Sequence, residues 1–88
     1  MMDDHTTLMM LEELADKLGI SIRYDKIKPD EDDAVLSGGL CRVKGAPVII
    51  INSGTATSRK IQVLVNALKH FDLDGVYIRP ALRELLER

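Results

Sequence analysis

Two β-rich runs separated by only two residues constrain the fold of this chain more than any other feature. LCRV and APVIII flank Lys44-Gly45, a connection typical of a tight β-hairpin, although Asn-Gly would be a stronger signal. Pairing across that turn sets Val43 against Ala46, and two residues further out it sets cysteine against valine. Pro47 has no backbone N–H to donate, so we expect it at an edge or a bulge of the sheet.

Two further segments complete the predicted strands. Residues 48 to 51 read VIII, an unbroken aliphatic run that predicts a strand covered on both faces. ISIRYD alternates instead, placing Ile20, Ile22 and Tyr24 on one face of a half-buried strand. Residues 28 to 33, KPDEDD, read as a polar loop whose acidic cluster lacks the glycine and distal Glu of a calcium-binding EF-hand loop.

Three segments have the periodicity or the end signals of helices. In TLMMLEELADKLG, leucines recur at steps of three and four, Thr7 can act as N-cap, and Gly19 supplies a left-handed stop. TSRKIQVLVNALKHF has the clearest apolar stripe, with Thr57 as its cap. PALRELLER begins with Pro80 at a natural first helical position, and so short a helix must dock its leucines on the domain or on another copy. Those leucines are Leu82, Leu85 and Leu86.

The order of these segments predicts the fold class. Helix, strand, hairpin, helix and short helix indicate an α+β fold with a small three-stranded, mainly antiparallel sheet that contains the hairpin. Two main helices and the short C-terminal helix pack on this sheet. We expect residues 1–88 to form a single domain, with residues 1–6 disordered, and the low aromatic content of 3% leaves Leu, Ile and Val to build the core.

Charge and cysteine content narrow the function classes. The net charge of −2 and the scattered basic residues argue against nucleic-acid binding. Cys41 is the single cysteine, so no intramolecular disulfide forms and a reducing compartment is indicated. The start, MMDDHTT, is acidic where a signal peptide is basic, and the longest aliphatic run is far shorter than the roughly 20 residues that span a bilayer. We therefore expect a cytoplasmic protein without a membrane partner.

The runs LEELADKLGISIRYD and GGLCRVKGAPVIIINS, followed by a helix, resemble the amino-terminal part of ImmA/IrrE-type zinc metallopeptidase domains. The hairpin of that family typically reads G-x-x-x-x-x-x-G-x-x-x-I-x-I-N, and the resemblance covers roughly residues 8 to 71. It implies that a helix, a strand and a hairpin precede an active-site helix bearing H-E-x-x-H. The first histidine ligand of that motif falls on Asn66, the general-base glutamate on Ala67 and the second histidine ligand on His70.

These replacements remove the chemistry that the resemblance implies. A catalytic zinc needs about three protein ligands and an open position for water, and a carboxylate must take a proton from that water. Asn66 offers a neutral amide oxygen and Ala67 accepts no proton. The family's third ligand has no clear match, since Glu84 and Glu87 lie on the short last helix. We expect no peptidase activity, no metal and no cofactor.

The helical period places these positions independently of the resemblance. If Leu68 points to the core, Asn66 and His70 lie roughly on the opposite side. Arg59 and either Gln62 or Val63 lie near them. An active-site helix presents its ligands on this face, but any helix also keeps its polar residues there. His70 is accordingly either a solvated histidine near the helix end, a remnant of a site or an interface contact.

Two other groups of residues have weaker signals. Ser53, Gly54 and Thr55 lie between a strand and a helix, which is the layout of an anion cradle, although the pattern of a P-loop is absent. The alternative is a loop whose hydroxyls cap the helix. Cys41 and His70 could in principle act as nucleophile and base, but a cysteine within a strand is usually a small core or face residue.

The preferred hypothesis is a non-catalytic, regulatory module that binds a protein partner or forms a homodimer. Its contact surface would be Leu82, Leu85, Leu86 and the exposed part of the hairpin. The alternative is a divergent metal-dependent hydrolase that uses His70. A weaker alternative is a transcription-associated regulator that touches DNA.

Overall fold

The computed structural model describes residues 3–26 and 38–87, so the acidic loop at residues 28 to 33 lies outside the described residues. The element order is the predicted one, and it confirms the α+β class. The elements are α1 (Asp4–Lys17), β1 (Ser21–Asp25), β2 (Gly38–Val43), β3 (Ala46–Asn52), α2 (Thr57–Leu68) and α3 (Pro80–Leu86).

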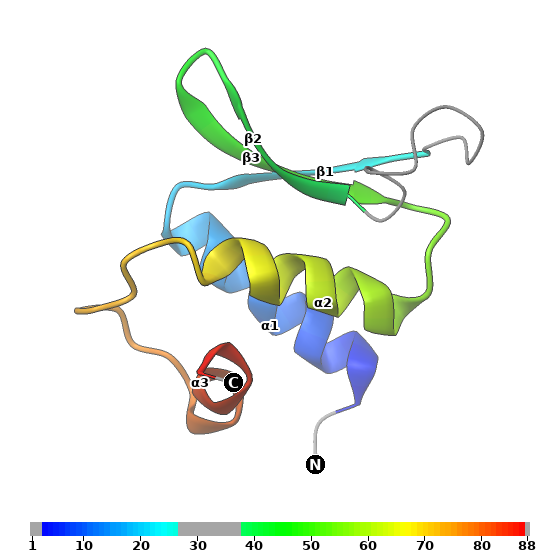
Figure 1. The fold of residues 1–88 in the computed structure, drawn as a ribbon. Coiled ribbons are helices and arrows are strands. Elements are labelled where there is room, and N and C mark those ends of the chain that lie inside the picture. Colours follow the sequence, from blue (N-terminus) through cyan, green and yellow to red (C-terminus); the bar gives the residue numbers. More distant parts are fainter. Residues whose placement is uncertain (1–2, 27–37, 88) are drawn as a thin grey trace.

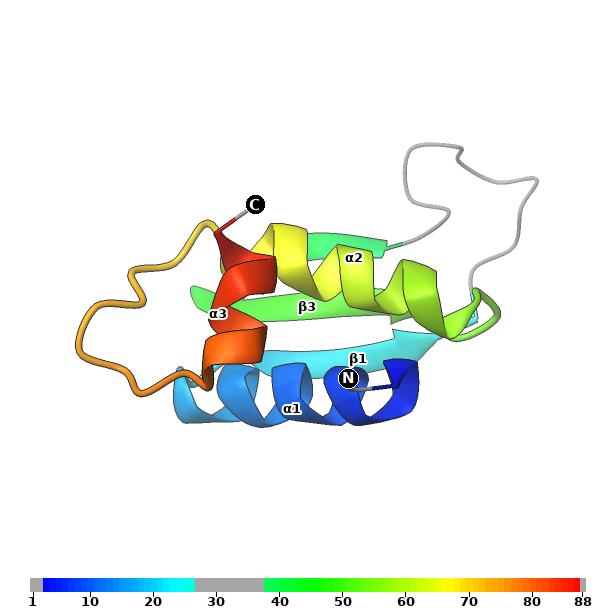
Figure 2. The ribbon, with the colours of Figure 1, turned by 90° about the horizontal axis from the view of Figure 1, so that it is seen from below.

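The strands form one sheet, and α1 and α2 cover one of its faces (Figure 1). Seen from below, α1 lies along β1, whereas α2 lies along β2 and β3 (Figure 2). Helix α3 packs against both α1 and α2, on the side away from the sheet. The core therefore fills the space between the sheet and the two long helices. Its fully buried large side chains are Leu11, Ile49, Ile51, Leu64 and Leu68.

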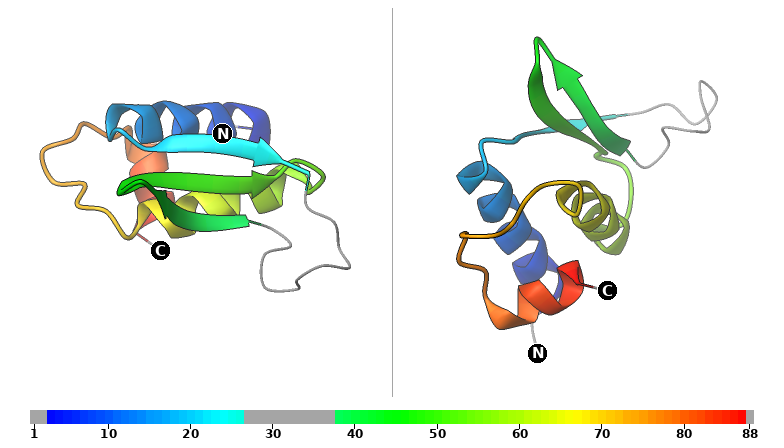
Figure 3. Two further views of the ribbon diagram at one scale, coloured as in Figure 1. Left: turned by 90° about the horizontal axis from the view of Figure 1, so that it is seen from above. Right: turned by 60° about the vertical axis from the view of Figure 1, so that its left-hand side comes forward.

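The sheet is mixed rather than purely antiparallel. Its strand order is β1-β3-β2, with β2 antiparallel to β3 across the hairpin. Strand β1 pairs with β3 in parallel, from Ser21 opposite Val48 to Asp25 opposite Asn52 (Figure 3). The most aliphatic strand thus takes the central position, where neighbours on both sides pair with its backbone.

The hairpin has the predicted turn and register. Lys44 and Gly45 both have positive φ, 53° and 82°, which defines the type I′ geometry that matches the twist of the flanking strands. This turn favours glycine or asparagine, because other residues adopt positive φ at a cost. Val43 lies opposite Ala46, and Cys41 lies opposite Val48.

The prediction for Pro47 is wrong, because Pro47 lies in the central strand β3, in continuous register with β2, and not at an edge or a bulge. Pro47 lies one residue before the parallel pairing with β1 begins at Val48, so its missing N–H removes no bond from that ladder. Ile49 and Ile51 belong to the core between the sheet and the helices. Val48 and Ile50 alternate to the opposite face, where none of the described helices packs. Val48 is buried there and Ile50 is half-buried, so coverage on both faces is met in part and without a helix on the second face.

Helix α1 begins earlier than its sequence pattern predicts. The N-cap is Asp3, whose carboxylate accepts a hydrogen bond from the backbone N–H of Thr6 at 2.8 Å. Thr7, the predicted cap, is instead a buried helical residue that donates its hydroxyl to the Asp3 carbonyl. The helix therefore includes residues 4–6, which the sequence assigned to a disordered start. Gly19, with φ of 76°, follows the helix end as predicted.

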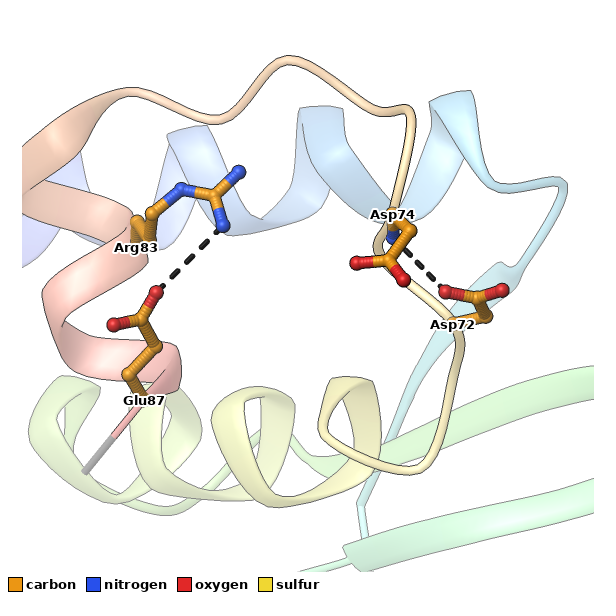
Figure 4. Close-up of polar contacts among 4 residues, drawn as sticks. All are labelled: Asp72, Asp74, Arg83 and Glu87. Atoms are coloured by element: carbon orange, nitrogen blue, oxygen red, sulfur yellow. Dashed lines mark hydrogen bonds and ion pairs between the residues drawn. The ribbon is translucent and has the colours of Figure 1, made fainter.

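The segment from α2 to α3 also differs from its predicted caps. Ala56 is the N-cap of α2 and makes no side-chain capping bond, so Thr57 is the first helical residue and not the cap. After α2 the backbone N–H of Asp74 donates to Asp72 at 2.9 Å, which closes the turn (Figure 4). Helix α3 begins at Pro80 as predicted. None of the helices in residues 3–26 and 38–87 is long and apolar enough to cross a membrane.

Candidate functional site

A surface groove runs between the edge strand β2 and helix α2, and we call it the α2 groove. Its volume is about 270 Å³. Strand β2 contributes Gly39 and Leu40. Helix α2 and the turn that follows it contribute Arg59, Gln62, Val63, Asn66, Ala67 and His70.

The helical period explains why these residues share one groove. Positions three, four and seven residues apart lie on one face of a helix, and Arg59, Gln62, Asn66 and His70 follow that spacing. Their expected clustering on the face away from Leu68 is confirmed. Asn66 and His70 are exposed. Val63 and Ala67, from the flank of the same stripe, are buried and give the groove an apolar floor.

The electrostatics of the α2 groove are one-sided. None of the described residues that line it carries a carboxylate. Arg59 lies at one end and donates from Nη1 to Oε1 of Gln62 at 3.0 Å. Between Asp33 and Asp72 the sequence contains five Lys and Arg residues but no Asp or Glu. The permanent charge of the groove, among the described residues that line it, is thus the single positive charge of Arg59.

The opposite edge of the sheet has the opposite charge. A second hollow lies along β1 and α1, and Glu12 and Asp16 are among the residues that line it. Both edges of the sheet thus have a helix beneath them and a hollow beside them. The hollow at β1 presents carboxylates, whereas the α2 groove presents N–H donors.

The chemistry of the α2 groove does not suit a catalytic metal. It holds one imidazole from His70, one amide from Asn66 and the methyl group of Ala67 at the three positions of the motif. Glu84 of α3 and Glu87, the C-cap of that helix, do not line it. Among the described residues, no group of three or more His, Cys, Asp and Glu side chains could hold a metal ion.

The backbone N–H groups of Ser53, Gly54 and Thr55, between β3 and α2, all donate to oxygen atoms of neighbouring strand residues. Ser53 donates to the Asp25 carbonyl at 3.0 Å, and Gly54 donates to Oδ1 of Asn52 at 3.0 Å. The N–H of Thr55 bonds the Asn52 carbonyl at 3.2 Å, and its hydroxyl bonds the same carbonyl at 2.8 Å. An anion cradle needs such donors pointing outward. These three residues therefore stabilise the loop and do not form the anion site that the sequence suggested.

The remaining sequence candidates are separated from the groove. Cys41 lies opposite Val48, on the sheet face away from α2, whereas His70 lines the α2 groove, so they do not form a nucleophile–base pair. Leu82 and Leu86 are 3% and 7% exposed and belong to the core. Leu85 is half-buried against it. The leucines of α3 dock on the domain itself, so Leu82 and Leu86 are not an exposed contact surface.

Sequence reasoning missed a polar cluster around Tyr24. Its hydroxyl donates to the carboxylate of Glu12 on α1, and Nζ of Lys60 on α2 lies 5.7 Å from the centre of its ring. Burial, followed by the bond to Glu12, raises the pKa of Tyr24 above its ordinary value. The alternation of β1 already placed Tyr24 on the helix-facing side, but no pattern in the sequence pointed to its partners.

Comparison with protein-family models, curated proteins and solved structures finds no match to this chain. Fold and groove together define a class: a small α+β domain with a mixed three-stranded sheet and, at one edge, a groove whose described lining carries one arginine and no carboxylate. The function must therefore be argued from the groove itself.

Proposed function

We propose that this chain is a non-catalytic protein-binding module and that the α2 groove is its binding surface. One observation carries the proposal. Asn66, Ala67 and His70 lie together in a groove beside an edge strand, and none of the described residues around them supplies a general base or a second strong metal ligand. The groove can therefore bind, but it lacks the groups that activate water.

We also propose that the scaffold is related to ImmA/IrrE-type metallopeptidase domains. The order of helix, strand, hairpin and helix supports this relation. So does the location of the motif positions Asn66, Ala67 and His70 at the open side of the helix, beside a sheet edge. On this view the cleft has been kept while its ligands have been lost.

The surface of the groove suits a polypeptide partner. Leu40 on the edge strand is 40% exposed, and Val63 and Ala67 form an apolar floor beneath it. Arg59, Gln62 and Asn66 supply polar groups around that floor. Protein interfaces combine an apolar centre with a polar rim in this way.

A different protein is a better candidate partner than a second copy. The sequence hypothesis of a homodimer depended on the leucines of α3, and burial of Leu82 and Leu86 removes most of that surface.

The single cysteine supports a location in the cytoplasm, where thiols stay reduced. No observation favours the hydrolase that would use His70, or a regulator that touches DNA.

Site-specific photo-crosslinking in the source cells tests the proposal. A photoreactive amino acid in place of Gln62 should give a defined crosslinked species, whereas the same group in place of the exposed Asp16 on α1 should not give that species. Asn66→Glu, which adds a carboxylate to the groove, should suppress the crosslink, and Asn66→Gln should preserve it. Purified protein that carries stoichiometric zinc and cleaves peptides would overturn the proposal.

A further inference from the structure

We propose that the α2 groove binds an acidic polypeptide segment in extended conformation, which adds a fourth strand to the sheet along β2. This inference rests on the proposed function and names the class of partner. Three features carry it: the position of β2 at an edge of the described sheet, the lack of carboxylates among the described residues that line the groove, and the spacing of Arg59 and His70.

Strand β2 is an edge of the sheet, because β3 is its one neighbour among the described strands. Val43 and Ala46 flank the two-residue turn, and such flanking residues exchange hydrogen bonds with each other. Pairs then alternate along an antiparallel ladder, so the backbone groups of Leu40 and Arg42 point away from β3. An edge with outward N–H and C=O groups is a template for an added strand.

A segment paired with β2 lies over helix α2, because Leu40 and the α2 stripe line the same groove. Alternate side chains of that segment point down toward the helix. There they meet Arg59, Gln62, Asn66 and His70, all of which carry N–H donors. Carboxylates are the side chains that best accept several N–H bonds at once.

The length of the groove sets the spacing of those carboxylates. Arg59 lies in the first turn of α2 and His70 lies in the turn just after the helix ends at Leu68, so the two are separated by about 16 Å if the helical rise is taken for the whole span. An extended chain rises about 3.3 Å per residue, so residues i and i+4 of a bound strand are about 13 Å apart on one face. Acidic side chains at i, i+2 and i+4 therefore reach Arg59 at one end, the amides in the middle and His70 at the other.

Charge also decides between this occupant and two others. A nucleic acid is anionic too, but the chain as a whole has a net charge of −2, and none of the described lining residues is a Phe, Tyr or Trp that would provide a large ring for base stacking. A second copy could offer its acidic β1 edge, but that contact is head-to-tail and does not close into a dimer. An acidic segment of a different protein meets neither objection.

Fluorescence anisotropy with synthetic peptides tests the inference. The probe is a labelled nine-residue peptide with Glu at alternate positions and Thr between them, and its control has Gln for every Glu. We expect the acidic peptide to bind at least about tenfold more tightly than the Gln peptide, and its affinity to fall with added salt. Two further acidic peptides are N-methylated, one at its odd-numbered residues and the other at its even-numbered residues, so each lacks half of the backbone N–H donors. In an added strand only alternate residues bond to β2, so one of these two peptides should lose binding and the other should keep it.

Variants of the protein locate the bound peptide. Arg59→Gln should weaken binding about three- to fivefold. Lys60→Gln is the matched control, because it also removes one positive charge from α2. The Lys60 side chain lies over Tyr24 and not in the α2 groove, so this variant should leave binding unchanged. Leu40→Pro removes an outward N–H and no ladder bond, so it should abolish binding. If that variant fails to fold, the N-methylated peptides test the same hydrogen bonds.

Each other outcome counts against the inference. Equal binding of the Gln peptide, equal losses for Arg59→Gln and Lys60→Gln, or tighter binding of a single-stranded oligonucleotide of equal length would each overturn it. Concentration-dependent growth in light scattering, blocked by the peptide, would assign the edge to a second copy instead. If no peptide binds while the crosslink from position 62 persists, the acidic-strand inference fails and the proposed function stands. If the crosslink is also absent, both fail.

Discussion

The hydroxyl of Tyr24 on β1 donates a hydrogen bond to the carboxylate of Glu12 on α1. Because Lys60 of α2 lies over the same ring, Tyr24 contacts both long helices from the edge of the sheet. In the sequence, residues 26–37 separate β1 from the hairpin, so contacts of this kind help to hold β1 in its parallel position beside β3. The cluster is a structural link at the β1 edge, on the side of the sheet away from the α2 groove.

Tyr24→Phe should lower the free energy of unfolding by about 0.5–1 kcal/mol, because the ring stays in place while a partly exposed hydrogen bond is lost. The pKa of Tyr24 is raised above its ordinary value of 10.0 by burial and by Glu12. The neutral hydroxyl therefore stabilises the fold fully below pH 10, and this contribution is lost as the pH rises through the raised pKa. Urea unfolding measures the free energy of unfolding of wild type and of Tyr24→Phe, and the difference between them should be smaller above pH 10 than at pH 7.

The N-cap of α1 gives a prediction at acidic pH. The hydrogen bond from the Thr6 backbone N–H lowers the pKa of Asp3 below its ordinary value of 3.8. Its stabilising effect is present above pH 3.8 and is lost as the pH falls through the lowered pKa. Asp3→Ala should lower the melting temperature at pH 7. Asp3→Asn should keep most of the stabilisation that the cap provides, since Asn caps helices well. The difference between wild type and Asp3→Ala should shrink below pH 3.8; a constant difference down to pH 2 would contradict the cap.

The hairpin turn can be improved and damaged at adjacent positions. Lys44 adopts φ of 53°, a conformation that asparagine tolerates better, so Lys44→Asn should stabilise the domain by about 0.5 kcal/mol. Gly45→Ala should destabilise it by about 1 kcal/mol, because φ of 82° strains any residue with a Cβ even though space around it is open. Thermal unfolding of both variants measures the two effects, and a neutral Gly45→Ala would contradict the type I′ turn.

The hairpin register was predictable because it depends on local chemistry. A two-residue turn fixes which residues face each other, and Lys44-Gly45 could form no other tight pairing of the two runs. The parallel pairing of β1 was not predictable, because alternation shows which side of a strand is buried but not which neighbour it has. The start of α1 was missed for a related reason. Asp3 and Thr7 are both good caps, and the choice depends on whether one more turn of helix packs well.

Only the part of the candidate site that depends on local sequence, the polar face of α2, could be predicted. The helical period alone brings Arg59, Asn66 and His70 to one face of α2. That face lines a groove because Leu40 of the edge strand lies beside it, and this contact joins segments that are far apart in the sequence. The leucines of α3 show a further limit of sequence patterns. An apolar stripe on a helix indicates that the stripe is covered, but it has the same spacing whether the domain itself or a partner covers it.

Substitutions in α3 separate these two roles. Leu82 is 3% exposed, so Leu82→Ala should cost about 2–4 kcal/mol of stability through lost packing and a cavity. Leu85 is half-buried, and Leu85→Ala should cost about 1 kcal/mol or less. Chemical denaturation at several protein concentrations measures both. Stability that rises with concentration in wild type but not in Leu85→Ala would instead place this helix at an interface between copies.

Zinc should not stabilise the wild-type protein, because the α2 groove offers one imidazole beside the amide of Asn66 and the methyl group of Ala67. We expect the melting temperature of wild type in equimolar zinc and in EDTA to agree within about 1 °C. The melting temperature of His70→Ala should be equally insensitive to zinc. Asn66→His is the positive control, since it places a second imidazole one turn from His70, and zinc should then raise the melting temperature by several degrees. If zinc stabilises wild type and His70→Ala abolishes the effect, the groove binds metal and the hydrolase alternative becomes the better account.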